Sequence, residues 1–175
     1  MVSAMTARRL DLDDLMRLTA FAAEAPRPLA ILEGIGVVAQ RVIGAKGFTM
    51  FRYLPATAEV ERIHSSDFAA YPVGGRKRIA DYPTNQSVLA RGEVYIAHGP
   101  DDIRGTYKDY EKIFGLGVTS IMNVPVRFGG ANIGAMNLFG EAGRFDAGKA
   151  ADARMLAGLL VAPLLALGAA DGGGR

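Results

Sequence analysis

The sequence has no cysteine and only two histidines among its 175 residues. Without cysteine there is no disulfide, no thiol nucleophile, no thiolate metal site and no chromophore attached to sulfur. Two histidines without cysteine also argue against a transition-metal centre. We therefore expect no metal and no other cofactor. The absence of cysteine is also compatible with a reducing cytoplasm.

Excess charge and long apolar segments are scarce as well. Lys and Arg number 20 against 18 Asp and Glu, and a net charge of +2 is too small to argue for nucleic acid or an acidic membrane surface. Residues 1–15 contain no apolar signal core. The most apolar run, residues 155–170, is shorter than the roughly 20 residues of a membrane span and contains Pro163. We expect a cytoplasmic protein with neither a nucleic-acid partner nor a membrane segment.

Sequence motifs of common catalytic sites are also missing. There is no nucleophile elbow and no phosphate loop. Gly34 and Gly36 lie inside a helical pattern that follows no strand, so close helix packing explains them better than a nucleotide loop. Asp101 and Asp102 fall in a loop, where carboxylates are typically solvated or capping. We therefore assign no catalytic residue.

The composition is that of one globular domain. Half of the residues are hydrophobic and 22% are charged, and the length is sufficient for a full core. Hydrophobic periodicity and the positions of glycine and proline predict alternating helices and strands. The expected helices cover residues 11–25, 28–44, 84–91, 106–114 and 146–168, and the expected strands before residue 100 cover 46–54, 58–64 and 93–97.

Residues 117–140 predict a β-hairpin around which the domain is organised. Two apolar strands, 119–126 and 133–139, flank a glycine-containing turn at 128–131. Simple pairing across this turn places Asn123 opposite Met136. Both would then lie on the less tightly filled face of the sheet, which suits a small-molecule site. The alternative is that Asn123 is a buried amide satisfied by neighbouring backbone.

Five steps in this region resemble, in order, the C-terminal half of a GAF domain. They are Val124-Pro125-Val126, Gly129-Gly130, Ile133-Gly134, Asn137-Leu138 and Phe145-Asp146. The resemblance implies an α/β (α+β) fold with an antiparallel sheet of five to six strands and helices on both faces, usually acting as a small-molecule sensor. It covers residues 28–168. Residues 1–27 would form a separate N-terminal helix, and 169–175 a disordered tail.

The candidate ligand-binding residues come from the loops and the hairpin. In the long irregular stretch 65–83, the basic cluster of Arg76, Lys77 and Arg78 is either a solvated loop or a flap in which an arginine grips an anionic group. In the resemblance, the segments between the second strand and the Val-Pro strand form a lid over the ligand. The predicted binding residues are Arg76, Arg78, Tyr82, His98, Tyr107, Tyr110, Asn123 and Met136.

These patterns favour a sensory or regulatory domain that binds a small, at least partly anionic molecule. It would signal through a partner or through a homodimer formed by the N- and C-terminal helices. Two alternatives stay open. One is an enzyme in which His98 is the general base, oriented by Asp101. The other is a structural dimerisation module with an unused pocket.

Overall fold

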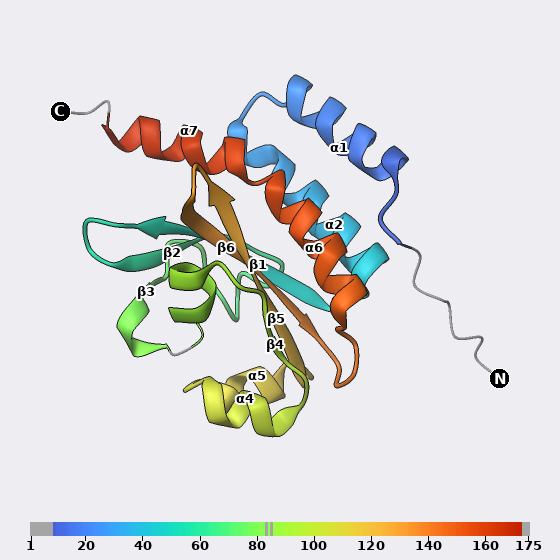
Figure 1. Ribbon diagram of the computed structural model, residues 1–175, viewed down its shortest axis with the longest axis vertical. Coiled ribbons are helices and arrows are strands. Elements are labelled where there is room, and N and C mark those ends of the chain that lie inside the picture. The colour runs from blue at the N-terminus through green and yellow to red at the C-terminus, as the bar shows by residue number, and fades with distance from the viewer. Residues whose placement is uncertain (1–8, 83, 85, 173–175) are drawn as a thin grey trace.

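A single antiparallel sheet forms the centre of the molecule in the computed structural model, which describes residues 9–82, 84 and 86–172 (Figure 1). Its six strands follow the order β3-β2-β1-β6-β5-β4. They are β1 (Gly47–Leu54), β2 (Glu59–Ser65), β3 (Arg76–Arg78), β4 (Tyr95–Ala97), β5 (Ser120–Phe128) and β6 (Ala131–Gly140). The predicted α/β fold with an antiparallel sheet is confirmed, and β3 is an added strand inside the stretch expected to be irregular.

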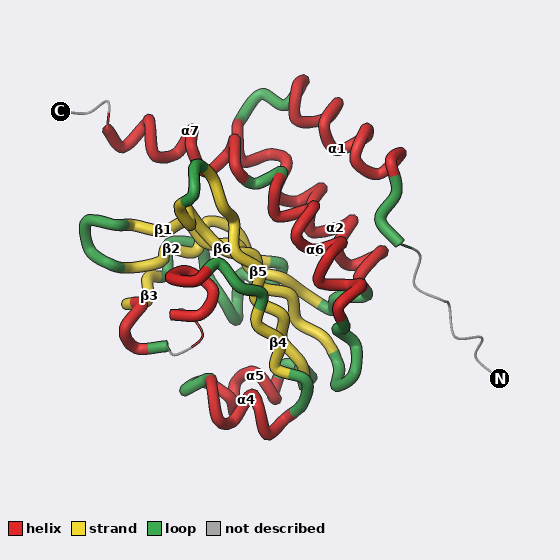
Figure 2. The backbone as a smooth tube through the Cα atoms, viewed as in Figure 1, coloured by secondary structure: helices red, strands yellow, loops and turns green. Residues whose placement is uncertain are grey.

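Helices cover both faces of this sheet (Figure 2). One layer contains α1 (Leu12–Glu24), η1 (Pro28–Ala30), α2 (Ile31–Ile43), α6 (Ala147–Gly158) and α7 (Val161–Gly172). The opposite side carries the short elements η2 (Ile79–Asp81), η3 (Gln86–Arg91), α4 (Pro100–Thr106) and α5 (Tyr110–Gly115). The short helices leave room over the sheet that the long helices do not.

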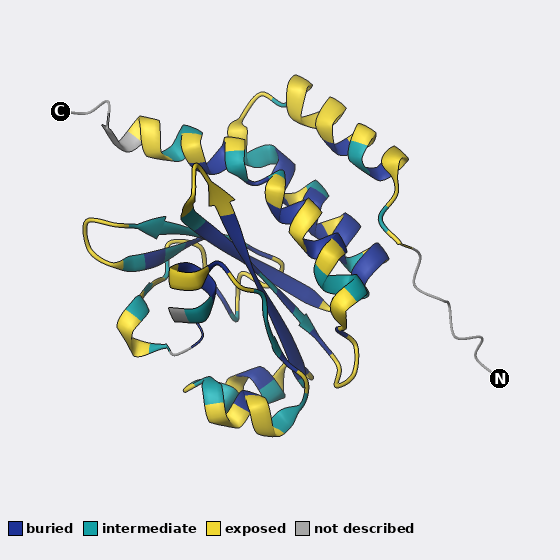
Figure 3. Cartoon of the chain, viewed as in Figure 1, coloured by how far each residue is buried: buried dark blue, intermediate teal, exposed yellow. Residues whose placement is uncertain are grey.

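The main core lies between the sheet and the long helices (Figure 3). Strand residues such as Phe48, Met122 and Leu138 are buried there against Ile35 of α2 and Leu156 of α6. Gly36 lets α2 approach this layer, because a Cβ at that position would lie 1.8 Å from the Phe48 ring. The packing explanation for this glycine is therefore confirmed.

The C-terminal helix is interrupted, whereas the sequence predicted one helix over residues 146–168. It begins as expected at Asp146, whose carboxylate accepts from the Lys149 amide, and α6 ends at Gly158. Pro163 explains the break, since it lacks an N–H and its ring clashes with the carbonyl four residues earlier. The following helix α7 runs to Gly172, past the predicted end, and residues 173–175 of the predicted tail lie outside the described part of the chain.

Together, α6 and α7 are long and apolar enough to cross a membrane by length and composition alone, over Ala147–Ala170. The apolar run predicted from sequence, residues 155–170, is shorter than this and was expected not to span a membrane. The buried face of the run belongs to the core, where Ala153, Leu156, Ala157 and Leu160 pack over the sheet. A core helix with such a face passes the same test of length and composition.

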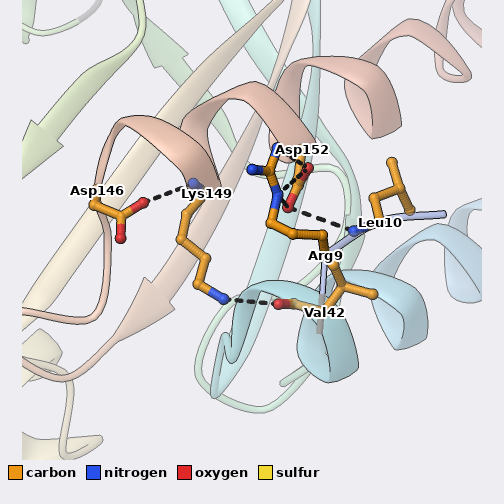
Figure 4. A network of polar contacts seen from close by, with 6 residues as sticks. All are labelled: Arg9, Leu10, Val42, Asp146, Lys149 and Asp152. Carbon is orange, nitrogen blue, oxygen red and sulfur yellow. Dashed lines mark hydrogen bonds and ion pairs between the residues drawn. The ribbon is translucent and has the colours of Figure 1, made fainter. Parts of the chain in front are cut away.

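A polar clamp ties the start of the chain to α6 (Figure 4). The Arg9 guanidinium donates to both carboxylate oxygens of Asp152, with Nε–Oδ2 at 2.8 Å and Nη2–Oδ1 at 2.9 Å. Asp152 itself is buried. In the same region, Lys149 Nζ donates to the Val42 carbonyl at 2.9 Å and so joins α6 to α2. The segment that leads into α1 is thus fixed to the helix layer.

Replacing Asp152 with alanine should release this segment. We expect a lower midpoint of thermal unfolding and faster amide exchange in α1 than in α2, because the Arg9 contacts hold only the former. Hydrogen exchange with calorimetry would measure both. Arg154→Gln, an exposed change on the same helix, is the control and should leave both unchanged; equal exchange in α1 of the Asp152 variant and the parent would contradict the clamp.

Candidate functional site

A β-bulge determines which residues of the hairpin face the site. The turn is tight as predicted, with positive φ at Gly129 and Gly130, and Arg127 pairs with Asn132. Between Val126 and Arg127, however, the register shifts by one residue, so Asn123 pairs with Asn137. A one-residue shift moves every later side chain to the other face. The predicted pairing of Asn123 with Met136 is therefore wrong.

Met136 consequently lies on the helix-covered side. It is fully buried in the main core, so its predicted place as the floor of the ligand site is also wrong. Asn137 takes that position beside Asn123 on the opposite face. Asn137 belongs to one of the five steps that resemble a GAF domain, but it is not among the binding residues predicted from sequence.

A small cavity of two adjoining compartments lies over that opposite face. Each compartment has a volume of about 40 Å³. The first is largely apolar, and its lining includes Phe51, Val60, Val88, Leu89 and Ala135. The second has a charged side, and its lining includes Arg62, Tyr71, Lys77 and Asp109. Five described residues border both compartments: Phe51, Lys77, Tyr107, Asn123 and Asn137.

The boundary between the compartments is polar. Tyr107 donates its hydroxyl hydrogen to Asn123 Oδ1 at 2.5 Å. Burial raises the pKa of Tyr107, so the hydroxyl stays protonated as a donor. The Asn123 side-chain oxygen thus accepts from another side chain. The alternative considered from sequence was a buried amide whose partners are neighbouring backbone groups.

Arg62 is the most buried cation of the site. Only 5% of the residue is exposed, and its guanidinium lies over the rings of Phe51 and Tyr71 at 5.1 and 5.0 Å. Its Nη1 donates to the Pro72 carbonyl at 2.9 Å. Its Nε–H is buried and has no hydrogen-bond partner among the described residues. Burial lowers the pKa of Arg62, so the surroundings disfavour its charge.

Lys77 and Asp109 complete the charged group. Their Nζ and Oδ2 atoms are 3.8 Å apart, and the Lys77 ammonium lies 4.6 Å from the centre of the Tyr82 ring. Burial lowers the pKa of Lys77 too. The second oxygen of Asp109, Oδ1, is buried and unpaired within the described part of the chain. Two cationic side chains therefore face one carboxylate here.

The alternation of β3 selects Lys77 over its neighbours. Lys77 pairs with Val60 and borders the cavity, whereas Arg76 and Arg78 are exposed and border neither compartment. Arg76 instead contacts Glu61 at 3.4 Å. The structure does not bring these two arginines to the cavity, because residues 76–78 form a strand and successive side chains point to opposite faces.

Of the other predicted residues, the structure brings Tyr82, Tyr107 and Asn123 to the cavity. Tyr110 and His98 border neither compartment. Tyr110 packs instead against the Phe114 ring in α5, with the ring centroids 5.9 Å apart. The structure therefore does not bring these two predicted residues to the cavity.

The geometry required by the enzymatic alternative is also missing. His98 is exposed, and its backbone N–H donates to Asp102 Oδ2 at 2.8 Å. Asp101 pairs with Arg104 instead of orienting the imidazole. Within residues 9–82, 84 and 86–172, no group of three or more histidine and carboxylate side chains could hold a metal ion.

Sequence reasoning missed Arg62, Asp109, Tyr71 and Asn137. A signal existed for Arg62, since it stands two residues after Val60 in a strand, and both border the cavity. Asp109 precedes a short helix whose position over the sheet no local pattern reveals.

An open groove adjoins the charged compartment. It has a volume of about 520 Å³, and its lining includes Ser66, Phe68 and Leu116. Tyr71 and Phe139 line both the groove and the compartment, with their ring centroids 5.8 Å apart. This pair of rings is therefore the wall between the buried charges and the surface.

Comparison with known proteins finds a likeness in structure. No protein-family model matches the chain, and no curated protein matches it. The GAF domain of a phosphoenolpyruvate-protein phosphotransferase from Acinetobacter superimposes with a TM-score of 0.73 at 12% identity, covering 92% of this chain and 96% of that one. The corresponding GAF domain from Coxiella burnetii gives 0.70 at 19%, covering 93% and 96%.

An enzyme structure shares the same architecture. The free methionine-R-sulfoxide reductase from Neisseria meningitidis, solved with its substrate, has a TM-score of 0.69 at 15% identity, with 93% of this chain and 96% of that one covered. Such low identities establish a common fold and leave the ligand to be argued from the residues of the cavity.

Proposed function

Because the chain has the GAF fold, we propose that it is a sensory or regulatory domain that binds a small anionic molecule in the cavity between the sheet and its short helices. The observation that carries this proposal is the excess of buried positive charge. Arg62 and Lys77 are both desolvated, yet Asp109 is the one carboxylate among the described lining residues. Buried charge without a matching partner is costly, and an anionic ligand would supply that partner.

The binding test is native mass spectrometry of the gently purified full chain, followed by a thermal-shift screen of small metabolites. An adduct lost on denaturation, or a metabolite that raises the unfolding midpoint, would support the proposal. Finding that neutral and cationic molecules bind while anions do not would contradict the assigned charge.

Arg62→Met should separate binding from stability. We expect the unliganded variant to be as stable as the parent or slightly more stable, because replacing a buried charge with a packed apolar side chain is often neutral or favourable. The affinity for an anion found in the screen should fall at least tenfold. Arg76→Met is the matched control, since Arg76 is exposed and outside the cavity. Unchanged anion affinity in Arg62→Met would remove this arginine from the site.

We also propose that two chains pair through the terminal helices. Several apolar side chains of α1 and α7 are exposed, among them Phe21 at 48% and Leu165 at 41%. An apolar groove of about 790 Å³ runs between the two helices and includes Ile31 and Phe128 in its lining. Burying such a patch against a second copy would remove it from water.

Phe21→Glu combined with Leu165→Glu should convert a dimer into a monomer in light-scattering measurements. The reason is that each charge would have to be buried in the pairing surface. Val73→Glu, a change at an exposed apolar residue outside the lining of that groove, is the control and should leave the mass unchanged. A monomeric parent protein at high concentration would refute the pairing.

A further inference from the structure

The charged compartment contains two buried atoms of opposite hydrogen-bonding character. The Arg62 Nε–H is a donor and Asp109 Oδ1 is an acceptor, and neither has a partner at hydrogen-bond geometry in the described residues. The Tyr71 hydroxyl lies nearby, and burial together with the charge of Asp109 raises the pKa of Tyr71 to about 12. Arg62 and Asp109 border the same compartment. Buried polar groups are nearly always paired, so two unpaired groups at one cavity indicate what its occupant supplies. That occupant must accept at one point and donate at another.

We propose that the ligand is a small hydroxy acid, whose carboxylate binds Arg62 and Lys77 and whose hydroxyl donates to Asp109. This inference rests on the proposed function and assigns a ligand class to it. The ligand would occupy the existing compartments, and the protein would have to open only to let it enter.

The guanidinium of Arg62 is already oriented for a carboxylate. The flanking rings of Phe51 and Tyr71 restrict its plane, and the Pro72 carbonyl takes the hydrogen of Nη1. The edge that contains Nε is the one left to receive a carboxylate side on, a geometry in which arginine binds strongly. Because this orientation is set before binding, little side-chain entropy remains to be lost.

Charge balance favours a hydroxy acid over an amino acid. Arg62, Lys77 and Asp109 together carry one net positive charge, which a hydroxy carboxylate with one negative charge neutralises. A zwitterionic amino acid would leave that positive charge uncompensated. An Asp109 oxygen accepts equally well from a hydroxyl, and Lys77 at 3.8 Å already supplies this carboxylate with a cation. The site therefore needs a donor without further positive charge.

The volume suits a ligand of about the size of lactate. A buried water requires roughly 10–15 Å³ of such space, so each compartment of about 40 Å³ admits about three water-sized groups. The two compartments together suit about six non-hydrogen atoms, the number in a three-carbon hydroxy acid. A methyl group would enter the apolar compartment beside Phe51, Val88 and Leu89.

Isothermal titration calorimetry of the full chain with four matched probes tests this inference. The probes are lactate, propanoate without the hydroxyl, propane-1,2-diol without the carboxylate, and alanine with an ammonium in place of the hydroxyl. We expect lactate to bind at least tenfold more tightly than each of the other three. Equal affinity for lactate and propanoate, or tighter binding of alanine, would overturn the assignment of the donor.

Two variants assign each half of the ligand. Arg62→Met should weaken lactate and propanoate alike by at least tenfold, whereas Asp109→Leu, which has no acceptor for the hydroxyl, should bring the affinity for lactate close to that for propanoate. Arg76→Met should bind all probes as the parent does. Circular dichroism and the unfolding midpoint verify that each variant is folded. A lactate preference that persists in Asp109→Leu would contradict the hydroxyl contact.

Failure of this inference can be distinguished from failure of the proposed function. If none of the four probes binds but native mass spectrometry finds another anion that Arg62→Met releases, the hydroxy-acid assignment is wrong and the anion-binding function stands. If no small molecule from the metabolite screen binds at millimolar concentration, both are wrong.

Discussion

Substituting alanine for Gly36 should lower the free energy of unfolding by about 3 kcal/mol, at the upper end of what overpacking a core costs. The new Cβ would lie 1.8, 2.2 and 2.3 Å from three carbons of the Phe48 ring. That ring is 1% exposed and stacks on His64 with centroids 5.4 Å apart, so it has no free space to enter. Either α2 or β1 must move.

Urea unfolding at equilibrium would measure this loss, with Gly34→Ala as the matched control. A Cβ at Gly34 meets only the end of the Leu18 side chain, at 3.2 Å. Alanine in a helix is favoured over glycine by up to about 1 kcal/mol, so this variant should be as stable as the parent or more so. Equal stability of the two variants would mean that Phe48 does not pack on Gly36.

Gly134→Ala should be comparably destabilising, by about 3 kcal/mol, for a different reason. Its Cβ would lie 2.3 Å from the Phe51 carbonyl oxygen and 2.8 Å from Leu164 Cδ1. The first atom belongs to the backbone of β1, which cannot rotate away as a side chain can. The substitution should therefore separate β1 from β6 locally.

Chemical denaturation together with hydrogen exchange would detect both effects, with the extra exchange confined to the β1–β6 ladder around Arg52 and Gly134. Gly168→Ala offers a control, because nothing lies within 4 Å of a Cβ there and alanine favours helix. A Gly134→Ala protein with parental stability would contradict the close approach of the two strands. Phe51 also borders the cavity, so weaker ligand binding is expected in the same variant.

Local chemistry allowed much of the fold to be predicted from sequence. The glycines at 129 and 130 adopt the positive φ that the turn requires, and Asp146 caps α6. These features depend on residues within a few positions of one another. The resemblance to a GAF domain predicted the rest of the sheet, and the observed six-stranded antiparallel sheet agrees with that prediction.

The site was harder to predict because it depends on register and on distant packing. Because of the one-residue shift between Val126 and Arg127, Asn137 faces the cavity where simple pairing had placed Met136. Three residues of strand at 76–78 do the same for the basic cluster, turning Lys77 inward. The sequence identified the hairpin and the basic cluster. It did not reveal the one-residue shift in the hairpin or the strand at residues 76–78, so it did not show which side chains face the cavity. Asp109 is brought to Lys77 by the packing of α5, which no short pattern encodes.

The bulge also restricts how this chain can change in length. Neighbouring residues of β6 belong to different layers, with Met136 and Leu138 in the helix core and Asn137 in the cavity floor. A deletion of one residue between the bulge and the end of the strand would bring an amide into the core and a methionine to the ligand. The hairpin tip at Gly129 and Gly130 lies beyond the bulge and meets neither layer, so insertions in pairs are tolerated there. Changes of length at the tip therefore have to keep the positive φ positions of the turn, and the bulge and the strand behind it can change only as one unit.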